Sequence, residues 1–280
     1  MFDTGSTNTW VLNKKTPLSG GKTKQFSYDE TASSTYQKTD QKAHITFGSG
    51  SLMGHFVTDD MRVGSCDGKS TGQIHIKNQK FGNVEKQKTI FTGSNFESIV
   101  GLAYPALAEK GVKPVFDEMI DQKLLKDNIF AFYLTSKQAE LAGNKSDLTF
   151  GYYDKAKFDG DVHWNPVDYK YMFGVPFENI LFNGKESDIC SSGKHKCLIT
   201  FDSGTSLMSM PKYATDLLAQ KGVPSAQHVK KCDSQNQYGS MAFKIGGQLY
   251  ELSNDEWMFP AKDISMGMLA QGGKTSITFK

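Results

Sequence analysis

A chain of 280 residues is long enough for one large domain or for two lobes with separate hydrophobic cores. Hydrophobic residues make up 38% of the sequence and aromatic residues 12%, which excludes an intrinsically disordered chain. The 32 basic and 30 acidic side chains are well mixed, and the formal net charge of +2 gives no field for nucleic acid or an anionic membrane. No apolar run is long enough to span a bilayer, so no membrane span is expected.

The chain reads mostly as short strands separated by turns rich in Gly, Asn, Asp and Ser. Strand patterns cover residues 43–47, 73–77, 147–151 and 241–245. The first of them continues through Gly48-Ser49-Gly50 into a returning pattern over 52–57, which predicts a hairpin. From its spacing alone, an ordinary surface hairpin is the favoured interpretation.

Helical patterns are fewer. One covers residues 115–125, where the apolar residues on one face are Val115, Phe116, Met119, Ile120 and Leu124. A second helix is expected after Pro211, with Gly222 as its stop signal. Many strands and few helices predict a mainly β protein.

One sequence motif occurs twice. Phe2-Asp3-Thr4-Gly5-Ser6-Thr7 recurs as Phe201-Asp202-Ser203-Gly204-Thr205-Ser206, and apolar residues follow each copy. The repeat predicts two duplicated lobes that face each other. A boundary is expected where Asp, Lys and Gly cluster at 153–160, which gives an N-terminal lobe at 1–155 and a C-terminal lobe at 156–280.

The repeated motif suits a catalytic carboxylate. A carboxylate at a strand end can point into a cleft, the glycine lets other backbone approach closely, and neighbouring hydroxyls can orient the carboxylate. A single copy fits an Asp-Gly turn equally well, and such a match arises by chance on the order of once or twice per hundred chains of this length. Two copies, each after a Phe, favour the functional interpretation, with Asp3 and Asp202 as a catalytic pair.

The four cysteines allow more than one interpretation. Cys190 and Cys197 enclose a short loop, which is compatible with one small disulfide in an oxidising compartment. Together with His195 they can also be read as three metal ligands, although no fourth ligand is nearby. Cys66 and Cys232 have no local mate, and whether they pair is open. The sequon Asn144-Lys145-Ser146 is compatible with secretion, although such sequons are common by chance.

The two motifs and three further features resemble the pepsin and cathepsin D family of aspartic peptidases over nearly the whole chain. These features are Trp10 after the first motif, Phe47-Gly48-Ser49-Gly50-Ser51, which is similar to the family's flap hairpin, and Ile99-Val100-Gly101-Leu102-Ala103-Tyr104-Pro105. The last resembles the apolar-apolar-Gly segment that threads behind the first catalytic loop. The resemblance implies a bilobal β fold with an active-site cleft between duplicated lobes and a substrate extended across it.

The resemblance also implies a mechanism without metal or cofactor. Asp3 and Asp202 would lie close together around one water and share a proton, as is general for such carboxylate pairs. The ionised carboxylate takes a proton from the water, which attacks the scissile carbonyl, and the protonated one stabilises the oxyanion. Thr4 and Ser203 would interlock the two catalytic loops, to which Gly5 and Gly204 also belong. Ser6 and Thr205 would form hydrogen bonds with the outer carboxylate oxygens.

By the same resemblance, the flap and substrate-binding residues are Phe47, Gly48, Ser49, Gly50, Ile99 and Trp10. Apolar lining by Phe47, Ile99 and Leu207 implies an acid endopeptidase that cuts peptides or proteins between apolar residues. Pepstatin-type inhibition, a monomer and a zymogen are expected, with passage through the secretory pathway to a lysosome, a vacuole or the outside of the cell. The family places a small disulfide at Cys190 and Cys197.

Two departures from the family pattern keep an alternative open. Phe47 stands where the family has a Tyr whose hydroxyl reaches toward the indole N–H of the tryptophan matched by Trp10, which predicts some loss of activity. The chain also ends before the last strands of the second lobe and begins after the first strands of the first lobe. It is therefore expected to be a fragment or a truncated homologue. The alternative function is a non-catalytic pepsin-like protein that binds peptides or a partner.

Overall fold

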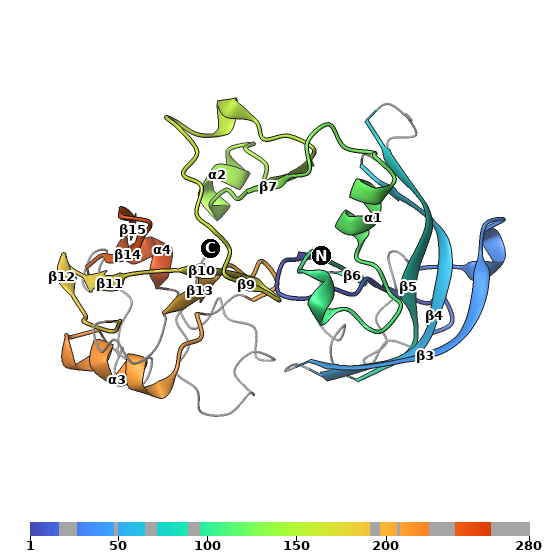
Figure 1. The fold of residues 1–280 in the computed structure, drawn as a ribbon, viewed down its shortest axis with the longest axis horizontal. Coiled ribbons are helices and arrows are strands. Elements are labelled where there is room, and N and C mark those ends of the chain that lie inside the picture. Colours follow the sequence, from blue (N-terminus) through green and yellow to red (C-terminus); the bar gives the residue numbers. More distant parts are fainter. Residues whose placement is uncertain are drawn as a thin grey trace. The chain divides into compact units, whose positions relative to one another are not determined.

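The computed structural model describes residues 1–16, 27–47, 50–64, 72–88, 96–190, 197–205, 208–223 and 239–258. The chain divides into two compact units, Met1–Asp161 (the first unit) and Val162–Lys280 (the second unit). Their described parts consist mainly of β-strands, as the sequence predicts, and Figure 1 shows the order of the elements. Within these residues, no helix combines the length and the apolar character that crossing a bilayer requires.

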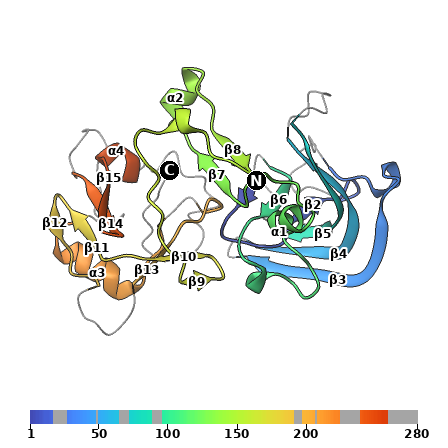
Figure 2. The same ribbon diagram turned by 45° about the horizontal axis from the view of Figure 1, so that its top comes forward.

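A six-stranded sheet organises the first unit, with the strand order β1-β6-β2-β5-β4-β3. Its strands are β1 (Phe2–Asp3), β2 (Trp10–Leu12), β3 (Gln37–Phe47), β4 (Gly50–Val63), β5 (Ile74–Lys88) and β6 (Ser98–Gly101). Figures 1 and 2 show β3, β4 and β5 as long, curved neighbours. The predicted hairpin is present within β3 and β4, which pair antiparallel with Phe47 opposite Gly50.

The core of the first unit is built around the Trp10 ring, which is 1% exposed. The ring packs against Phe56 of β4 at a centroid distance of 5.4 Å. It also covers Gly82 of β5, where a Cβ atom would come within 2.2 Å of a ring carbon, so only glycine fits there. The indole Nε1 is buried and has no hydrogen-bond partner among the described residues. Shape, rather than hydrogen bonding, therefore fixes this ring.

The helix α1 (Val115–Asp121) buries Val115 and Met119 against the strands of the first unit. It ends four residues earlier than the apolar pattern predicts, because Lys123 adopts a left-handed backbone conformation with φ +55°. The side chain of Gln122 then bonds the backbone of Lys77 on β5 twice, accepting from its N–H at 3.0 Å and donating to its carbonyl at 2.9 Å.

The remaining elements of the first unit are short. The strands β7 (Phe130–Tyr133) and β8 (Asp147–Phe150) form a two-stranded sheet, and the helix α2 (Lys137–Leu141) lies in the connection between them. Where the first unit is described, 3₁₀ turns cover Glu30–Ala32, Pro105–Leu107 and Lys155–Lys157. The predicted strand at 147–151 corresponds to β8, which ends one residue earlier, before Gly151 at φ +83°.

A buried carboxylate joins distant parts of the first unit. Asp59 on β4 is 3% exposed and accepts hydrogen bonds from the hydroxyls of Tyr28 (2.6 Å), Ser33 (2.8 Å) and Thr35 (2.5 Å). It also accepts from the backbone N–H of Asp60 at 2.8 Å. Burial raises the pKa of the Asp59 carboxyl, but these hydrogen bonds outweigh it, so the pKa lies below its ordinary value. The ionised Asp59 carboxylate therefore attaches the 28–35 segment to β4.

The described part of the second unit contains two sheets. The strands β13 (Leu198–Thr200), β10 (Phe173–Pro176) and β9 (Tyr169–Lys170) form the first, in that order. The strands β12 (Lys185–Glu186), β11 (Asn179–Phe182), β14 (Met241–Ile245) and β15 (Gln248–Leu252) form the second. The helices α3 (Lys212–Gln220) and α4 (Asn254–Trp257) contribute Leu218 and Trp257 to the hydrophobic core of this unit. Both the predicted helix after Pro211 and the predicted strand at 241–245 are present.

Candidate active site

The first motif forms a loop at the end of β1. The Asp3 side chain, whose residue is 7% exposed, accepts a hydrogen bond from the Gly5 backbone N–H at 2.9 Å on Oδ1. Its Oδ2 accepts from the Ser6 hydroxyl. Each carboxylate oxygen thus has a donor within three residues, and the short loop itself orients the carboxylate. Thr4 is buried in the same loop.

The strand β6 supports this loop from behind. It runs parallel to β1, with Asp3 opposite Gly101, and the loop's carbonyls at Asp3 and Ser6 accept from Leu102 (2.8 Å) and Ala103 (2.9 Å). A Cβ on Gly101 would lie 2.3 Å from the carbonyl carbon of Thr7, so the loop and the strand touch backbone to backbone. The segment from Ile99 to Pro105, which resembles the family's apolar-apolar-Gly segment, therefore lies against the first motif.

The second motif forms a loop after β13. Oδ1 of Asp202 accepts from the Gly204 backbone N–H at 2.8 Å, and Oδ2 accepts from the Thr205 hydroxyl at 2.6 Å. The same two donor positions of the motif are used as around Asp3. Asp202 itself is half-buried, whereas Ser203, Gly204 and Thr205 are exposed in the described structure.

The two carboxylates are therefore held in the same local way. In both loops, the backbone N–H of the residue two positions after the Asp donates to one carboxylate oxygen. The hydroxyl of the residue three positions after the Asp donates to the other oxygen. Hydrogen bonds of this kind fix the direction of the carboxylate's remaining lone pairs. A carboxylate held in this way can accept a proton from water or donate one to an oxygen, which is general acid–base chemistry.

The other expected substrate-binding residues fall into two groups. Trp10 and Ile99 lie opposite each other on β2 and β6, and both are buried in the hydrophobic core of the first unit. Phe47 ends β3, and Gly50 begins β4 with φ +155°, a conformation that favours glycine. Gly48, Ser49 and Leu207 lie outside the described residues.

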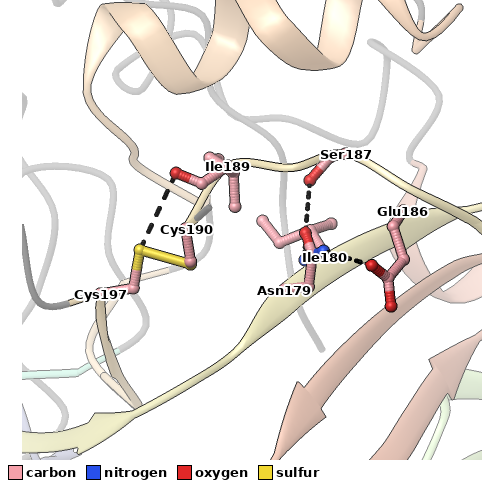
Figure 3. The surroundings of a disulfide bond; sticks show 7 residues. All are labelled: Asn179, Ile180, Glu186, Ser187, Ile189, Cys190 and Cys197. Carbon is pink, nitrogen blue, oxygen red and sulfur yellow. Dashed lines mark hydrogen bonds between the residues drawn. A yellow bond between two sulfur atoms is a disulfide. The ribbon is translucent and has the colours of Figure 1, made fainter. Parts of the chain in front are cut away.

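The second unit holds the expected disulfide between Cys190 and Cys197, whose Cα atoms are 5.8 Å apart (Figure 3). Buried Asn179 fixes the chain that leads into it. Its Oδ1 accepts from the backbone N–H of Ile180 (2.9 Å) and from the hydroxyl of Ser187 (3.0 Å), and its Nδ2 donates to Glu186 (3.1 Å). The disulfide joins Cys190, which follows the hairpin of β11 and β12, to Cys197, the residue before β13. β13 is the strand that leads to Asp202.

Metal ligation has no support in the described part of the chain, where no group of three His, Cys, Asp or Glu side chains is arranged to hold an ion. The cysteines in question are joined by the disulfide. His195, Cys66 and Cys232 lie outside the described residues.

Sequence reasoning missed two residues that position the first loop, Thr7 and Asn8. Both are buried; Thr7 donates from its hydroxyl to the Tyr104 carbonyl at 3.0 Å, and Asn8 accepts from the Glu109 N–H at 3.0 Å. The signal was the uninterrupted polar run from Ser6 to Thr9 directly before Trp10, a place where a strand would otherwise be apolar.

Comparisons with known proteins agree with this architecture. The family model described as "Eukaryotic aspartyl protease" matches residues 1–275. The chain is 33% identical to gastricsin from Callithrix jacchus over 257 residues, which cover 90% of this chain and 62% of that protein. It is 31% identical to cathepsin D from Gallus gallus over 266 residues, which cover 92% and 63%, and 31% identical to aspartic protease 3 from Toxoplasma gondii over 271 residues, which cover 94% and 40%.

The chain therefore spans about three fifths of the length of the gastricsin and cathepsin D relatives. Its mainly β architecture is that of the pepsin-like proteins, as the two motifs predicted. A match over nearly its whole length means that the chain belongs to the eukaryotic aspartyl protease family.

Proposed function

We propose that the protein is an aspartic endopeptidase in which Asp3 and Asp202 act as a pair. The observation that carries the proposal is the repeated geometry of the two loops, in which the same motif positions donate to the same carboxylate oxygens. Membership of the family and the likeness to gastricsin and cathepsin D support it.

In this mechanism the two carboxylates hold one water and one shared proton, as is general for aspartic protease pairs. The ionised Asp takes a proton from the water as its oxygen attacks the scissile carbonyl carbon. The protonated Asp donates a hydrogen bond to the oxyanion that develops. The backbone and hydroxyl donors of each loop keep both side chains in position. The flap residues Phe47 to Gly50 then bind an extended peptide, and cleavage falls between apolar residues at acidic pH.

The experiment measures hydrolysis of denatured haemoglobin or of an apolar fluorogenic peptide at acidic pH by the full-length gene product, with and without pepstatin. Asp3→Asn and Asp202→Asn each remove the acid–base group and keep the shape of the side chain. Each is expected to lower kcat by about 10³-fold or more. Pepstatin is expected to block the wild-type activity.

Asp159→Asn is the matched control, because Asp159 is an exposed carboxylate outside both motifs. It is expected to leave the rate unchanged. Circular dichroism establishes that each variant is folded. Activity that persists in either motif variant would contradict the pair. No activity from a folded, propeptide-free protein would favour a pepsin-like protein that binds peptides or a partner without cleaving them.

A further inference from the structure

The sequon Asn144-Lys145-Ser146 lies in the connection between α2 and β8, and all three of its residues are exposed. The backbone at this point is well defined. Gly143 adopts φ +94°, and the Asn144 N–H donates to the Ala139 carbonyl at 2.9 Å. The loop therefore presents the Asn144 carboxamide from a fixed turn at the end of a helix.

The Asn144 side chain has no structural task that would account for an asparagine at this position. Its carboxamide makes no hydrogen bond with the described residues, and its backbone does not adopt the left-handed conformation that favours Asn. Other asparagines differ clearly. The Asn179 amide organises a buried network, and Asn183 adopts φ +50° and accepts from the Ser240 N–H. The fold alone thus explains those residues, but it does not explain Asn144.

Ser146, in contrast, has a structural role. Its hydroxyl oxygen accepts from the Thr135 backbone N–H at 3.0 Å and lies 3.2 Å from the Thr135 hydroxyl. The serine on its own therefore does not point to modification. The informative residue is Asn144, placed two positions before a hydroxyl that modification of an asparagine requires.

Two independent features of the same chain favour a modified Asn144. The Cys190–Cys197 disulfide indicates folding in an oxidising compartment, and in eukaryotes that is also where oligosaccharides are transferred to asparagine. Beside the sequon, Leu141 of α2 is 81% exposed and Leu134 is 59% exposed. A bulky hydrophilic group on Asn144 would cover part of this apolar surface.

We propose that Asn144 is an N-glycosylation site. An oligosaccharyltransferase joins Nδ2 of Asn144 to C1 of the first sugar of a lipid-linked diphospho-oligosaccharide. The bond between C1 and the diphosphate oxygen breaks, the lipid diphosphate leaves with the electron pair, and the amide proton passes to a base of the transferase. No oxidation or reduction takes place. The proposal is independent of whether the protein cleaves peptides.

The experiment expresses the full chain behind the signal peptide of a eukaryotic secretory host and treats the product with peptide N-glycosidase in heavy-oxygen water. Wild type is expected to lose the mass of one oligosaccharide, and peptide mapping is expected to find a heavy-oxygen aspartate at position 144. Asn144→Gln and Ser146→Ala are expected to show no loss of mass. Ser146→Thr is expected to behave as wild type, because it keeps the sequon and the hydroxyl.

Asn144→Gln also protects the test against misfolding, because it leaves the Thr135–Ser146 contact intact. A further readout is the solubility of the secreted protein, which is expected to fall in Asn144→Gln as Leu141 and Leu134 are uncovered. Secretion of wild-type protein with an unmodified Asn144, while a reporter glycoprotein in the same cells is glycosylated, would overturn the proposal. An oligosaccharide retained in Asn144→Gln would overturn it as well.

Discussion

The two motif loops have the same hydrogen bonds but different surroundings. Asp3 is buried, and β6 lies directly behind its loop with Gly101 against the backbone of Thr7. Asp202 is half-buried and follows β13, which within the described residues lies at the edge of its sheet and pairs with β10 alone. Local geometry therefore comes from the motif itself, whereas burial comes from segments far away in the sequence. The difference suggests where each loop is sensitive to substitution.

The largest expected effect comes from the glycine behind the first loop. Gly101→Ala places a Cβ 2.3 Å from the backbone of Thr7, and backbone cannot give way without moving the loop. We expect a loss of about 3 kcal/mol in the free energy of unfolding, measured by urea denaturation. Activity per folded molecule is expected to fall too, because Asp3 moves with its loop.

Gly174→Ala is the comparison in the second unit. Gly174 lies on β10 opposite Thr200, and its added Cβ would meet the Cβ of Tyr169 on the short strand β9 at 2.6 Å. Because Tyr169 is half-exposed on an edge strand, it can move outward, and we expect a loss of about 1 kcal/mol. Equal losses in the two variants would mean that the two loops are supported equally well.

Removal of the disulfide is expected to act on the second unit alone. Replacing Cys190 and Cys197 by Ser opens a loop closed over a separation of 7 residues, which raises the entropy of the unfolded chain. The expected loss is about 2.5 kcal/mol of stability. Hydrogen exchange is expected to accelerate in β14 of the second unit and to stay unchanged in β5 of the first. Faster exchange in β5 would contradict this separation.

Asp59→Asn tests the buried carboxylate that attaches the 28–35 segment to β4. The wild-type carboxyl has a pKa below its ordinary value, so its stabilisation is complete above the unfolded pKa of about 3.9 and is lost as the pH falls through the folded value. We expect the variant to be about 2 kcal/mol less stable than wild type at neutral pH. This difference in the free energy of unfolding is expected to disappear in strong acid. Urea denaturation across this pH range measures both quantities.

The exposed carboxylate Asp40 on β3 provides the control. Asp40→Asn is expected to have no more than a small effect at any pH. A gap between wild type and Asp59→Asn that stays constant into strong acid would show that Asp59 contributes through its shape, not through its charge.

The smallest expected effects concern the hydroxyls that bind the two carboxylates. Ser6→Ala removes a donor beside Asp3, which is only 7% exposed and so less open to water than Asp202, and we expect kcat to fall about tenfold. Thr205→Ala removes the matching donor beside half-buried Asp202, where water can take its place, and we expect about a threefold fall. Ser6→Thr and Thr205→Ser keep the hydroxyls and serve as controls. A larger effect at Thr205 than at Ser6 would reverse the comparison.

The sequence predicted best what depends on neighbouring residues. β14 occupies the predicted range because Met241 to Ile245 form a short apolar run, broken only by Lys244, and α3 follows Pro211 and ends before Gly222. The carboxylate donors Ser6 and Thr205 lie three residues from their aspartates. In contrast, Thr7 and Tyr104 are separated by 97 residues, and no local pattern indicates that they touch.

The lengths of β4 and β5 were underestimated for the same reason. Both strands contain register shifts, one of them between Asp59 and Met61, and each shift breaks the alternation by which a strand is recognised. Asn78 on β5 even has φ +53°, which is rare within a strand. Asp59 itself was a usable signal, because an acidic residue that follows the apolar pair Phe56-Val57 on a strand calls for local hydrogen-bond donors if it is buried.

The Trp10 ring has a consequence for the residue at position 47. Gly82 and Phe56 locate the ring by steric fit, and its indole N–H has no acceptor among the described residues. The orientation of the ring therefore does not depend on a hydrogen bond to its N–H, whichever residue stands at position 47. The ring acts as a rigid packing block against β4 and β5, and because its N–H is buried, an acceptor could reach it only if the surrounding core moved.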